Sequence, residues 1–302
     1  MYYEYAVDPA SFDSWQTTRY LLDAFGFDKG RLICEFPTKH WKRLVYEHIS
    51  TAPLRDIERA RMVERLKMLP RETLMRRPGA AFNAATPWIR NAVAEHARCA
   101  FKAVLSPGKD AGTDDVLDPR EVDATDARWS VPPAETLPRE VSTVVPRLRP
   151  LLQQASVIRV VDPYFHPRGA LKVQFLHAIV RAAAPDAVIE VYLKEGASGE
   201  PGRSLCATAD ARLPEQIPAG RTVDILVWRE RPGGERFHNR FLLTNVGGVQ
   251  FGDGLEQGEG AEVDRVSRLG DRECEEYRQR YGANSTAFEF VCRTTVRGTR
   301  RG

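Results

Sequence analysis

Several familiar catalytic and cofactor motifs are missing from the sequence. It contains no Walker A loop, no GxGxxG dinucleotide fingerprint, no GxSxG nucleophile elbow and no residues with metal-ligand spacing. These absences argue against a P-loop nucleotide hydrolase, a dinucleotide-dependent oxidoreductase, a serine hydrolase of the nucleophile-elbow type and a metalloenzyme. We therefore expect neither a cofactor nor a bound metal.

Paired cysteines and long apolar runs are missing as well. The five cysteines are scattered singly, without a CxxC pair, and this usage favours reduced thiols over a disulfide framework. No apolar stretch approaches the ~20 residues that a membrane-spanning helix needs. The start, "MYYEYAVDPA", lacks the charged and apolar segments of a signal peptide. The sequence thus predicts a cytoplasmic protein without a transmembrane segment.

The chain also has little excess charge of either sign. Its 44 basic and 41 acidic residues give a formal net charge of +3. A protein dedicated to coating nucleic acid is usually more basic, although this balance does not exclude local basic patches. The 302 residues, 42% of them hydrophobic, suffice for one large domain or two modest ones, each with its own core.

The N-terminal part, residues 1–109, has helical patterns. In "PLRDIERARMVERLKML" apolar residues recur at every third position with charges between them, which predicts a buried stripe on an exposed helix. The stripe comprises Leu54, Ile57, Ala60, Val63 and Leu66. A second helix is predicted for "TPWIRNAVAEHARCAFKAVL", with Thr86 as its N-cap and Pro87 at the first helical position. This region is therefore expected to be mainly helical.

Residues 110–140 have a different composition. Aspartate, glycine and proline are frequent there and apolar residues are few, as in solvated connections. We interpret this segment as an acidic, proline-rich linker. Its carboxylates lack the spacing of a calcium-binding loop, so we expect them to be solvated.

From residue 141 to 302 strand and helix patterns alternate. The β-branched run "SVIRVV" ends at Asp162-Pro163, a helix follows in "GALKVQFLHAIVRAAA", and "AVIEVYLKE", "TVDILVWRE" and "AFEFVCRTTV" read as further strands. A hairpin across Pro232-Gly233-Gly234 is expected to join "TVDILVWRE" to "RFHNRFLLTN". The terminal "GTRRG" is expected to form a short disordered basic tail. The predicted class is α/β, with a mixed sheet flanked by helices.

One strand of this region carries a pair of residues suited to phosphate. Alternate residues of a strand point to the same face, so His238 and Arg240 are expected to lie together while Phe237 and Phe241 face the core. The guanidinium fork of arginine matches an oxyanion with two hydrogen bonds. Without further context, a His and an Arg on a solvent-facing strand surface is the favoured interpretation of the pair.

The spacing around this pair supplies that context. His238-x-Arg240, then Asn245, then Gly252 resembles the phospholipase D superfamily signature, in which His-x-Lys is followed by Asp and a pair of small residues. Here Arg240 stands for the Lys, Asn245 for the Asp and Asp253 for the second small residue.

A more similar group lies within that superfamily. The stretch "FHNRFLLTNVGGVQFGDGLE" resembles the phospholipase D-like domain found at the C-terminus of MIT-domain proteins and its bacterial relatives. The resemblance covers about Val141–Arg297. It implies a phospholipase D-like α/β domain that recognises a phosphate-bearing ligand or nucleic acid. Because bacterial members occur in multi-gene conflict or anti-phage systems, it also implies protein partners.

The mechanism implied by the resemblance needs more than one motif. One histidine attacks phosphorus and a second protonates the leaving group, so an enzyme with one motif requires a homodimer. A second copy in "HWKRLVYE", with His40, Lys42 and Glu47, reads equally well as a helix. Asn245 cannot balance the charge of an imidazolium as an aspartate does. These departures favour phosphate binding over turnover.

Three functions therefore stay open. The favoured one is phosphate or nucleic-acid recognition by a subunit of a bacterial multi-component system. The alternatives are a homodimeric, metal-independent phosphodiesterase or nuclease with His238, Arg240 and Asn245 as catalytic residues, and a structural adaptor that acts through residues 1–109. We include Asp162 because sites of α/β sheets lie at carboxyl strand ends. The candidate ligand-binding residues are Asp162, His238, Arg240, Asn245, Gly252 and Gly254.

Overall fold

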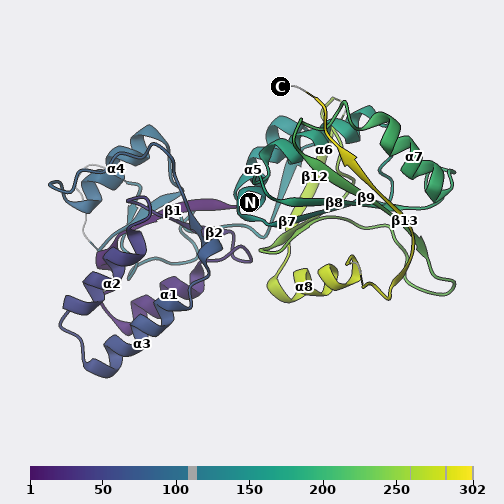
Figure 1. Cartoon of the computed structure of the whole chain (residues 1–302). Coiled ribbons are helices and arrows are strands. Elements are labelled where there is room, and N and C mark those ends of the chain that lie inside the picture. The colour runs from purple at the N-terminus through teal and green to yellow at the C-terminus, as the bar shows by residue number, and fades with distance from the viewer. Residues whose placement is uncertain (108–113, 259, 283, 301–302) are drawn as a thin grey trace. The chain divides into compact units, whose positions relative to one another are not determined.

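The computed structural model describes residues 1–107, 114–258, 260–282 and 284–300. The chain divides into two compact units, of which the first is Tyr2–Pro132 and the second begins at Pro133 and also includes Met1. Each unit has its own β-sheet with helices on both faces (Figure 1). The predicted α/β class is therefore confirmed.

The N-terminal unit contains a five-stranded sheet with the order β3-β2-β1-β4-β5, and all of its strands are parallel. Its strands are β1 (Tyr3–Val7), β2 (Arg31–Cys34), β3 (Leu74–Met75), β4 (Ala103–Leu105) and β5 (Val116–Leu117). Its helices are α1 (Trp15–Ala24), α2 (Trp41–Thr51), α3 (Asp56–Lys67) and α4 (Trp88–Arg98), with 3-10 turns at Pro9–Ser11 and Arg71–Thr73.

Strand alternation divides the core of this unit into two layers. Tyr5 and Val7 of β1 pack against α1, α2 and α3, where Trp41 is fully buried. Ala6 of the same strand faces the opposite side and packs with Ala92 of α4. The sheet therefore lies between two layers of helix.

Three details of the N-terminal unit differ from the sequence-based expectation. The expected helices form, but the parallel sheet was not anticipated, and the predicted second helix ends at Arg98 before β4 begins. In α3, Met62 and Leu66 are buried whereas Ile57 is 71% exposed. A strict three-residue spacing drifts around a helix of 3.6 residues per turn, so it does not stay on one face.

The expected linker 110–140 is divided between the two units. Residues 110–113 lie outside the described residues, but β5 belongs to the N-terminal sheet and Trp129 is buried in its core. Residues Ala134–Pro138 form the edge strand of the sheet in the C-terminal unit. Asp118 and Asp126 each bind an arginine two residues further along the chain, whereas Asp115 contacts His96 of α4.

The C-terminal unit contains an eight-stranded mixed sheet with the order β13-β9-β8-β7-β10-β11-β12-β6. Its strands are β6 (Ala134–Pro138), β7 (Val157–Val161), β8 (Val188–Lys194), β9 (Thr222–Glu230), β10 (Arg240–Thr244), β11 (Gly248–Phe251), β12 (Val263–Arg268) and β13 (Phe288–Arg297). Its helices are α5 (Val141–Gln154), α6 (Ala170–Ala182), α7 (Gly202–Arg212) and α8 (Asp271–Arg280). The strands β7, β8 and β9 are parallel, and the others join antiparallel.

Helices cover both faces of this sheet. Figure 1 shows α5, α6 and α7 on one face and α8 on the other. Under α8 lies an aromatic cluster in which Phe237 stacks on Phe288 with ring centres 4.9 Å apart and Phe241 lies 4.2 Å from Tyr277. Because both faces are covered, β10 is buried from Phe241 through Thr244 instead of alternating between core and solvent.

The predicted hairpin does not form. Strand β9 pairs with β8 and β13, while β10 pairs with β7 and β11. Residues 231–239 therefore cross the end of the sheet from β9 to β10 without joining them as neighbours. A glycine-rich connection between two apolar strands indicates a turn, but it does not determine which strands pair.

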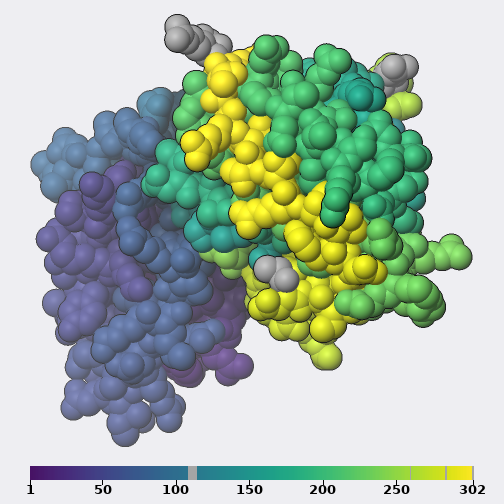
Figure 2. All heavy atoms as spheres, turned by 45° about the vertical axis from the view of Figure 1, so that its right-hand side comes forward, coloured from purple at the N-terminus to yellow at the C-terminus, as the bar shows by residue number. Residues whose placement is uncertain are grey.

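The end of the chain is ordered further than expected. Strand β13 runs across the surface beside α7 (Figure 2). Beyond it, the Gly298 and Arg300 amides donate to the carbonyls of Arg221 and Ile217 at 2.9 and 3.1 Å. Of the predicted disordered tail, residues 301 and 302 lie outside the described residues. No helix in the described part of the chain is long and apolar enough to cross a membrane.

Candidate functional site

One edge of the eight-stranded sheet brings together most of the predicted site residues. The parallel strands β7, β8 and β9 all end there: β8 at Lys194, β9 at Glu230, and β7 at Val161, directly before Asp162. Strand β10 runs the other way, with Phe241 opposite Val161, so it begins at the same edge with Arg240. The carboxyl ends of parallel strands are where α/β sheets usually place ligand sites.

The segment before β10 is anchored by Phe237. Its ring is fully buried, and its amide donates to the Glu230 carboxylate at 2.7 Å. The next residue, His238, is exposed and precedes the strand. It lines a shallow pocket with Tyr164, Lys194, Glu230 and Arg236. The predicted alternation of Phe237 inside and His238 outside is therefore confirmed.

Arg240 is held between an aromatic ring and a backbone turn. Its guanidinium carbon lies 4.8 Å from the centre of the Tyr164 ring, and Nη1 donates to the Gly252 carbonyl at 3.3 Å. Its Nε is buried and has no hydrogen-bond partner among the described residues. Within the described residues, no carboxylate forms an ion pair with Arg240; the neighbouring carboxylates pair with Lys172 and Arg139 instead. A buried donor without an acceptor is uncommon and costs stability.

Asp162 has a structural role at this edge. It is fully buried and accepts hydrogen bonds from the Tyr164 amide at 2.9 Å and from Lys172 Nζ at 3.1 Å. Lys172 also donates to the Tyr164 carbonyl at 2.9 Å. The pair connects the start of α6 to the end of β7 and fixes the Tyr164 ring beneath Arg240. Asp162 thus positions the site without facing solvent itself.

The two predicted glycines form the turn after β11. Gly252 and Asp253 donate their amides to Asp264 Oδ1, each at 3.0 Å, and a Cβ on Gly252 would lie 2.6 Å from that oxygen. Gly254 has φ +153°, a conformation that favours glycine. A Cβ there would lie 4.0 Å from Arg240 Nε. Gly252 therefore lets the turn close on Asp264, and Gly254 supplies a backbone conformation that other residues rarely adopt.

Asn245 lies elsewhere. It follows the far end of β10, five residues from Arg240, which places it roughly 16 Å away along the strand. Its Oδ1 accepts the amides of Ser156 and Val157 at 2.8 and 3.1 Å, where β7 begins. The expectation that Asn245 joins His238 and Arg240 at one site is therefore wrong. Asn245 instead secures the start of the neighbouring strand.

The carboxylates of this edge are engaged with lysine and arginine. Glu230 accepts from Lys194 at 2.6 Å, and this hydrogen bond lowers the pKa of Glu230 below its usual value. Glu256 accepts from Arg139 at 2.5 Å. Within the described ranges, no hydrogen bond joins His238 to a carboxylate that would orient its ring as a nucleophile.

The second copy of the motif considered for residues 40–47 is part of α2. Trp41 there is fully buried, and its indole nitrogen donates to the Val7 carbonyl. A helix does not present His40 and Lys42 side by side as a strand would. The helical interpretation of this stretch is therefore confirmed.

Sequence reasoning missed the residues that support Arg240. Tyr164 follows Asp162 by two positions, so its proximity to the strand end was a usable signal. Lys172 lies ten residues after Asp162, on a helix, and Lys194 and Glu230 end other strands. Only the order of strands in the sheet brings them together.

Comparisons with known proteins add little to this geometry. No protein-family model and no curated protein matches the chain. Among solved structures, an archaeal chromatin protein, TrmBL2, described as having a novel mode of DNA binding, is similar with a TM-score of 0.30 and 12% identity. The match covers 53% of this chain and 55% of that one, about half of each. Similarity at this level carries no argument about function.

Proposed function

We propose that the C-terminal unit recognises a phosphate-bearing ligand at the edge of its eight-stranded sheet, without cleaving it. Arg240 is the principal anion contact, and the exposed His238 is a second one. The observation that carries the proposal is the guanidinium of Arg240, which is held by the Tyr164 ring and the Gly252 carbonyl and forms no ion pair with a carboxylate of the described residues. A phosphate supplies the missing negative charge.

The surroundings of Arg240 support binding. Lys172 and Lys194 have carboxylate partners within 3.1 and 2.6 Å, so they are neutralised in the folded protein. Arg240 instead contacts a ring and a carbonyl. Together these features leave one fixed cation for an incoming oxyanion.

The same surroundings argue against turnover. Nucleophilic catalysis by histidine is assisted by a group that orients the ring and stabilises its charge. Asp162 is committed to Lys172 and Glu230 to Lys194, while Asn245 lies at the opposite edge. The resemblance to the phospholipase D-like group supports a phosphate site, and the wider role as a subunit of a bacterial multi-component system rests on that resemblance.

Isothermal titration calorimetry of the full chain tests the proposal. A thymidine dinucleotide, which contains one phosphodiester, is titrated into the wild type, Arg240→Ala and the control Arg272→Ala. Arg272 is a matched control because its side chain is 95% exposed and paired with Glu276 on α8. Loss of a charge-assisted hydrogen bond is worth roughly 1.5–3 kcal/mol, so Arg240→Ala is expected to bind at least about tenfold more weakly.

Equal affinities of the wild type and Arg240→Ala would contradict phosphate recognition at this edge. Hydrolysis of bis(4-nitrophenyl) phosphate in the presence of EDTA, lost in His238→Ala, would instead establish the homodimeric phosphodiesterase. Absence of binding by any of the three proteins would direct attention to the adaptor function of the N-terminal unit.

A further inference from the structure

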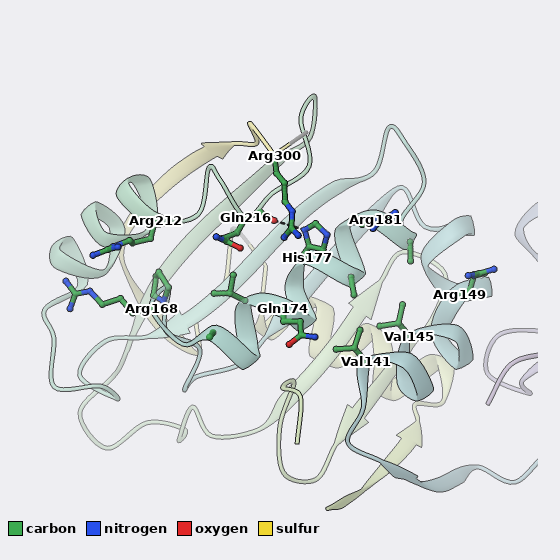
Figure 3. Close-up of a pocket in the computed structure, with 15 residues that line it drawn as sticks. Val141, Val145, Arg149, Arg168, Gln174, His177, Arg181, Arg212, Gln216 and Arg300 are labelled. Carbon is green, nitrogen blue, oxygen red and sulfur yellow. Dashed lines mark hydrogen bonds between the residues drawn. The ribbon is translucent and has the colours of Figure 1, made fainter. Parts of the chain in front are cut away.

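A second basic surface of the C-terminal unit lies away from the sheet edge. It is a groove of about 1070 Å³ over α5 and α6, closed by the end of α7 and the segment after β13 (Figure 3). Among the described residues, neither an aspartate nor a glutamate lines it. Five arginines of the same residues do: Arg149, Arg168, Arg181, Arg212 and Arg300.

The arginines of this groove differ from most others in the protein in having few partners. Arg168 is paired with Glu200 at 3.1 Å. The side chains of the other four make no hydrogen bond or ion pair with any residue that the structure describes. All four are exposed. Their charges are therefore available to a ligand without breaking a contact within the protein.

Helix ends account for only part of this arrangement. Arg181 and Arg212 occupy the last turns of α6 and α7, where the helix dipole favours a cation. Arg149 lies inside α5 and Arg300 follows a strand, so the dipole does not explain them. The backbone of Arg300 is tied to Ile217 and Ala219, which holds its side chain over the groove.

The guanidinium groups are spread along the groove and do not converge on one point. Figure 3 shows Arg168 and Arg212 at one end, Arg300 beside His177 in the middle, and Arg181 and Arg149 toward the other end. His177 is fixed by a 2.6 Å hydrogen bond from Nδ1 to the Gln216 carbonyl. A row of separated cations fits an extended chain of negative charges better than one small anion.

We propose that this groove binds the phosphate backbone of a nucleic acid. Arginine forks match phosphates with two hydrogen bonds, and neutralised phosphates release counterions. Small and apolar residues, among them Ala178 and Val145, form the floor between the arginines and leave room for sugars and bases. A flat bilayer surface does not enter a concave groove. The proposal uses none of the residues of the sheet edge and does not depend on the proposed function.

Fluorescence anisotropy of the full chain with a labelled 20-nucleotide oligo-dT tests the proposal. Affinity is measured between 50 and 200 mM NaCl, and a single-stranded RNA and a 20-base-pair duplex of equal length identify the preferred nucleic acid. For single-stranded nucleic acid, the slope of log K against log salt is about −0.7 for each phosphate that the protein neutralises. Four arginines therefore predict a slope near about −3 for the wild type.

The decisive comparison is between two double variants with the same net charge. Arg149→Ala/Arg181→Ala is expected to bind oligo-dT at least about tenfold more weakly and to lose about 1.4 from the magnitude of the slope. The control Arg19→Ala/Arg272→Ala removes two exposed arginines that are paired with Asp23 and Glu276, and it is expected to bind like the wild type.

Three results would overturn the proposal. The first is no binding of any of the nucleic acids by the wild type at 50 mM NaCl. The second is an equal loss in both double variants. The third is displacement of oligo-dT by polyglutamate at equal charge concentration, which would indicate an acidic peptide as the occupant. Thermal unfolding of both variants checks that neither has lost its fold.

Discussion

The sheet edge and the arginine groove of the C-terminal unit both contain several cations, but these cations differ in whether they have carboxylate partners. At the edge, Lys172, Lys194 and Arg139 each have a carboxylate partner within 3.1 Å. In the groove, Arg149 and Arg181 have no such partner among the described residues.

The difference separates cations that hold the fold from cations that are available to a ligand. In a pair such as Asp162–Lys172, loss of the lysine would leave the fully buried carboxylate without a cation. An exposed and unpaired arginine can be removed with little effect on folding. Arg240 is intermediate, because it lies within the paired network of the edge and yet has no carboxylate of its own.

The largest expected effect comes from removing one partner of an ion pair at the sheet edge. Asp162→Ala removes a fully buried carboxylate that accepts from the Tyr164 amide and from Lys172 Nζ, and it leaves Lys172 with only the Tyr164 carbonyl and the more distant Glu256. We expect the free energy of unfolding to fall by about 3 kcal/mol, as measured by urea denaturation. Arg149→Ala is the matched removal of an unpaired charge and should change that free energy by less than about 0.5 kcal/mol. Equal losses in both variants would contradict the distinction.

The next largest effect comes from reversing the charges of two unpaired arginines in the groove. Arg149→Glu/Arg300→Glu reverses two groove charges that are not at helix ends. We expect oligo-dT affinity to fall about 100-fold, which corresponds to about 2.7 kcal/mol, while the midpoint of thermal unfolding stays close to that of the wild type. Anisotropy and calorimetry on the same samples measure both quantities. A large loss of stability would show that these arginines hold the fold.

A smaller effect separates the two ends of β10. Asn245→Ala leaves the Ser156 and Val157 amides without their side-chain acceptor, which should destabilise the protein by about 1 kcal/mol. Dinucleotide affinity should not change, because Arg240 is at the opposite edge. Asn245→Asp retains an acceptor and should restore stability. Weakened dinucleotide binding in Asn245→Ala would show that Asn245 contributes to the phosphate site.

The smallest effect concerns the most exposed of the paired lysines at the edge. The hydrogen bond from Lys194 lowers the pKa of Glu230 in the folded protein. Such a carboxylate adds stability above its unfolded pKa of about 4.5, and this stability is lost as pH falls through the lower folded pKa. Glu230→Gln should therefore be about 0.5 kcal/mol less stable at pH 7. In urea denaturation at several pH values, a difference that persists at pH 3 would contradict the assignment.

The regular parts of the C-terminal unit were predictable from the sequence. Apolar β-branched runs correctly located β7, β8, β9 and β13, and the alternation of Phe237 and His238 correctly separated core from solvent. The sheet of the N-terminal unit was missed because strands such as β3 and β5 have only two residues, too few to establish a period.

The composition of the two basic surfaces was less predictable. The spacing of the motif placed Asn245 with Arg240, but five residues along a strand lead to the opposite edge of the sheet. The groove arginines come from residues 149 to 300, on separate helices and a terminal segment. No local pattern connects them, because their proximity follows from the packing of α5 and α6 and from the hydrogen bonds that hold Arg300.

The most direct test of the difference between paired and unpaired cations is one NMR titration. Arginine Nε–Hε signals of the full chain are followed as the 20-nucleotide oligo-dT is added, with single Arg→Lys variants for assignment. We expect the signals of Arg149, Arg181 and Arg300 to shift, while that of Arg278, which is paired with Glu275 on α8, does not. Shifts of equal size at Arg278, or none at the three groove arginines, would contradict the difference between paired and unpaired cations.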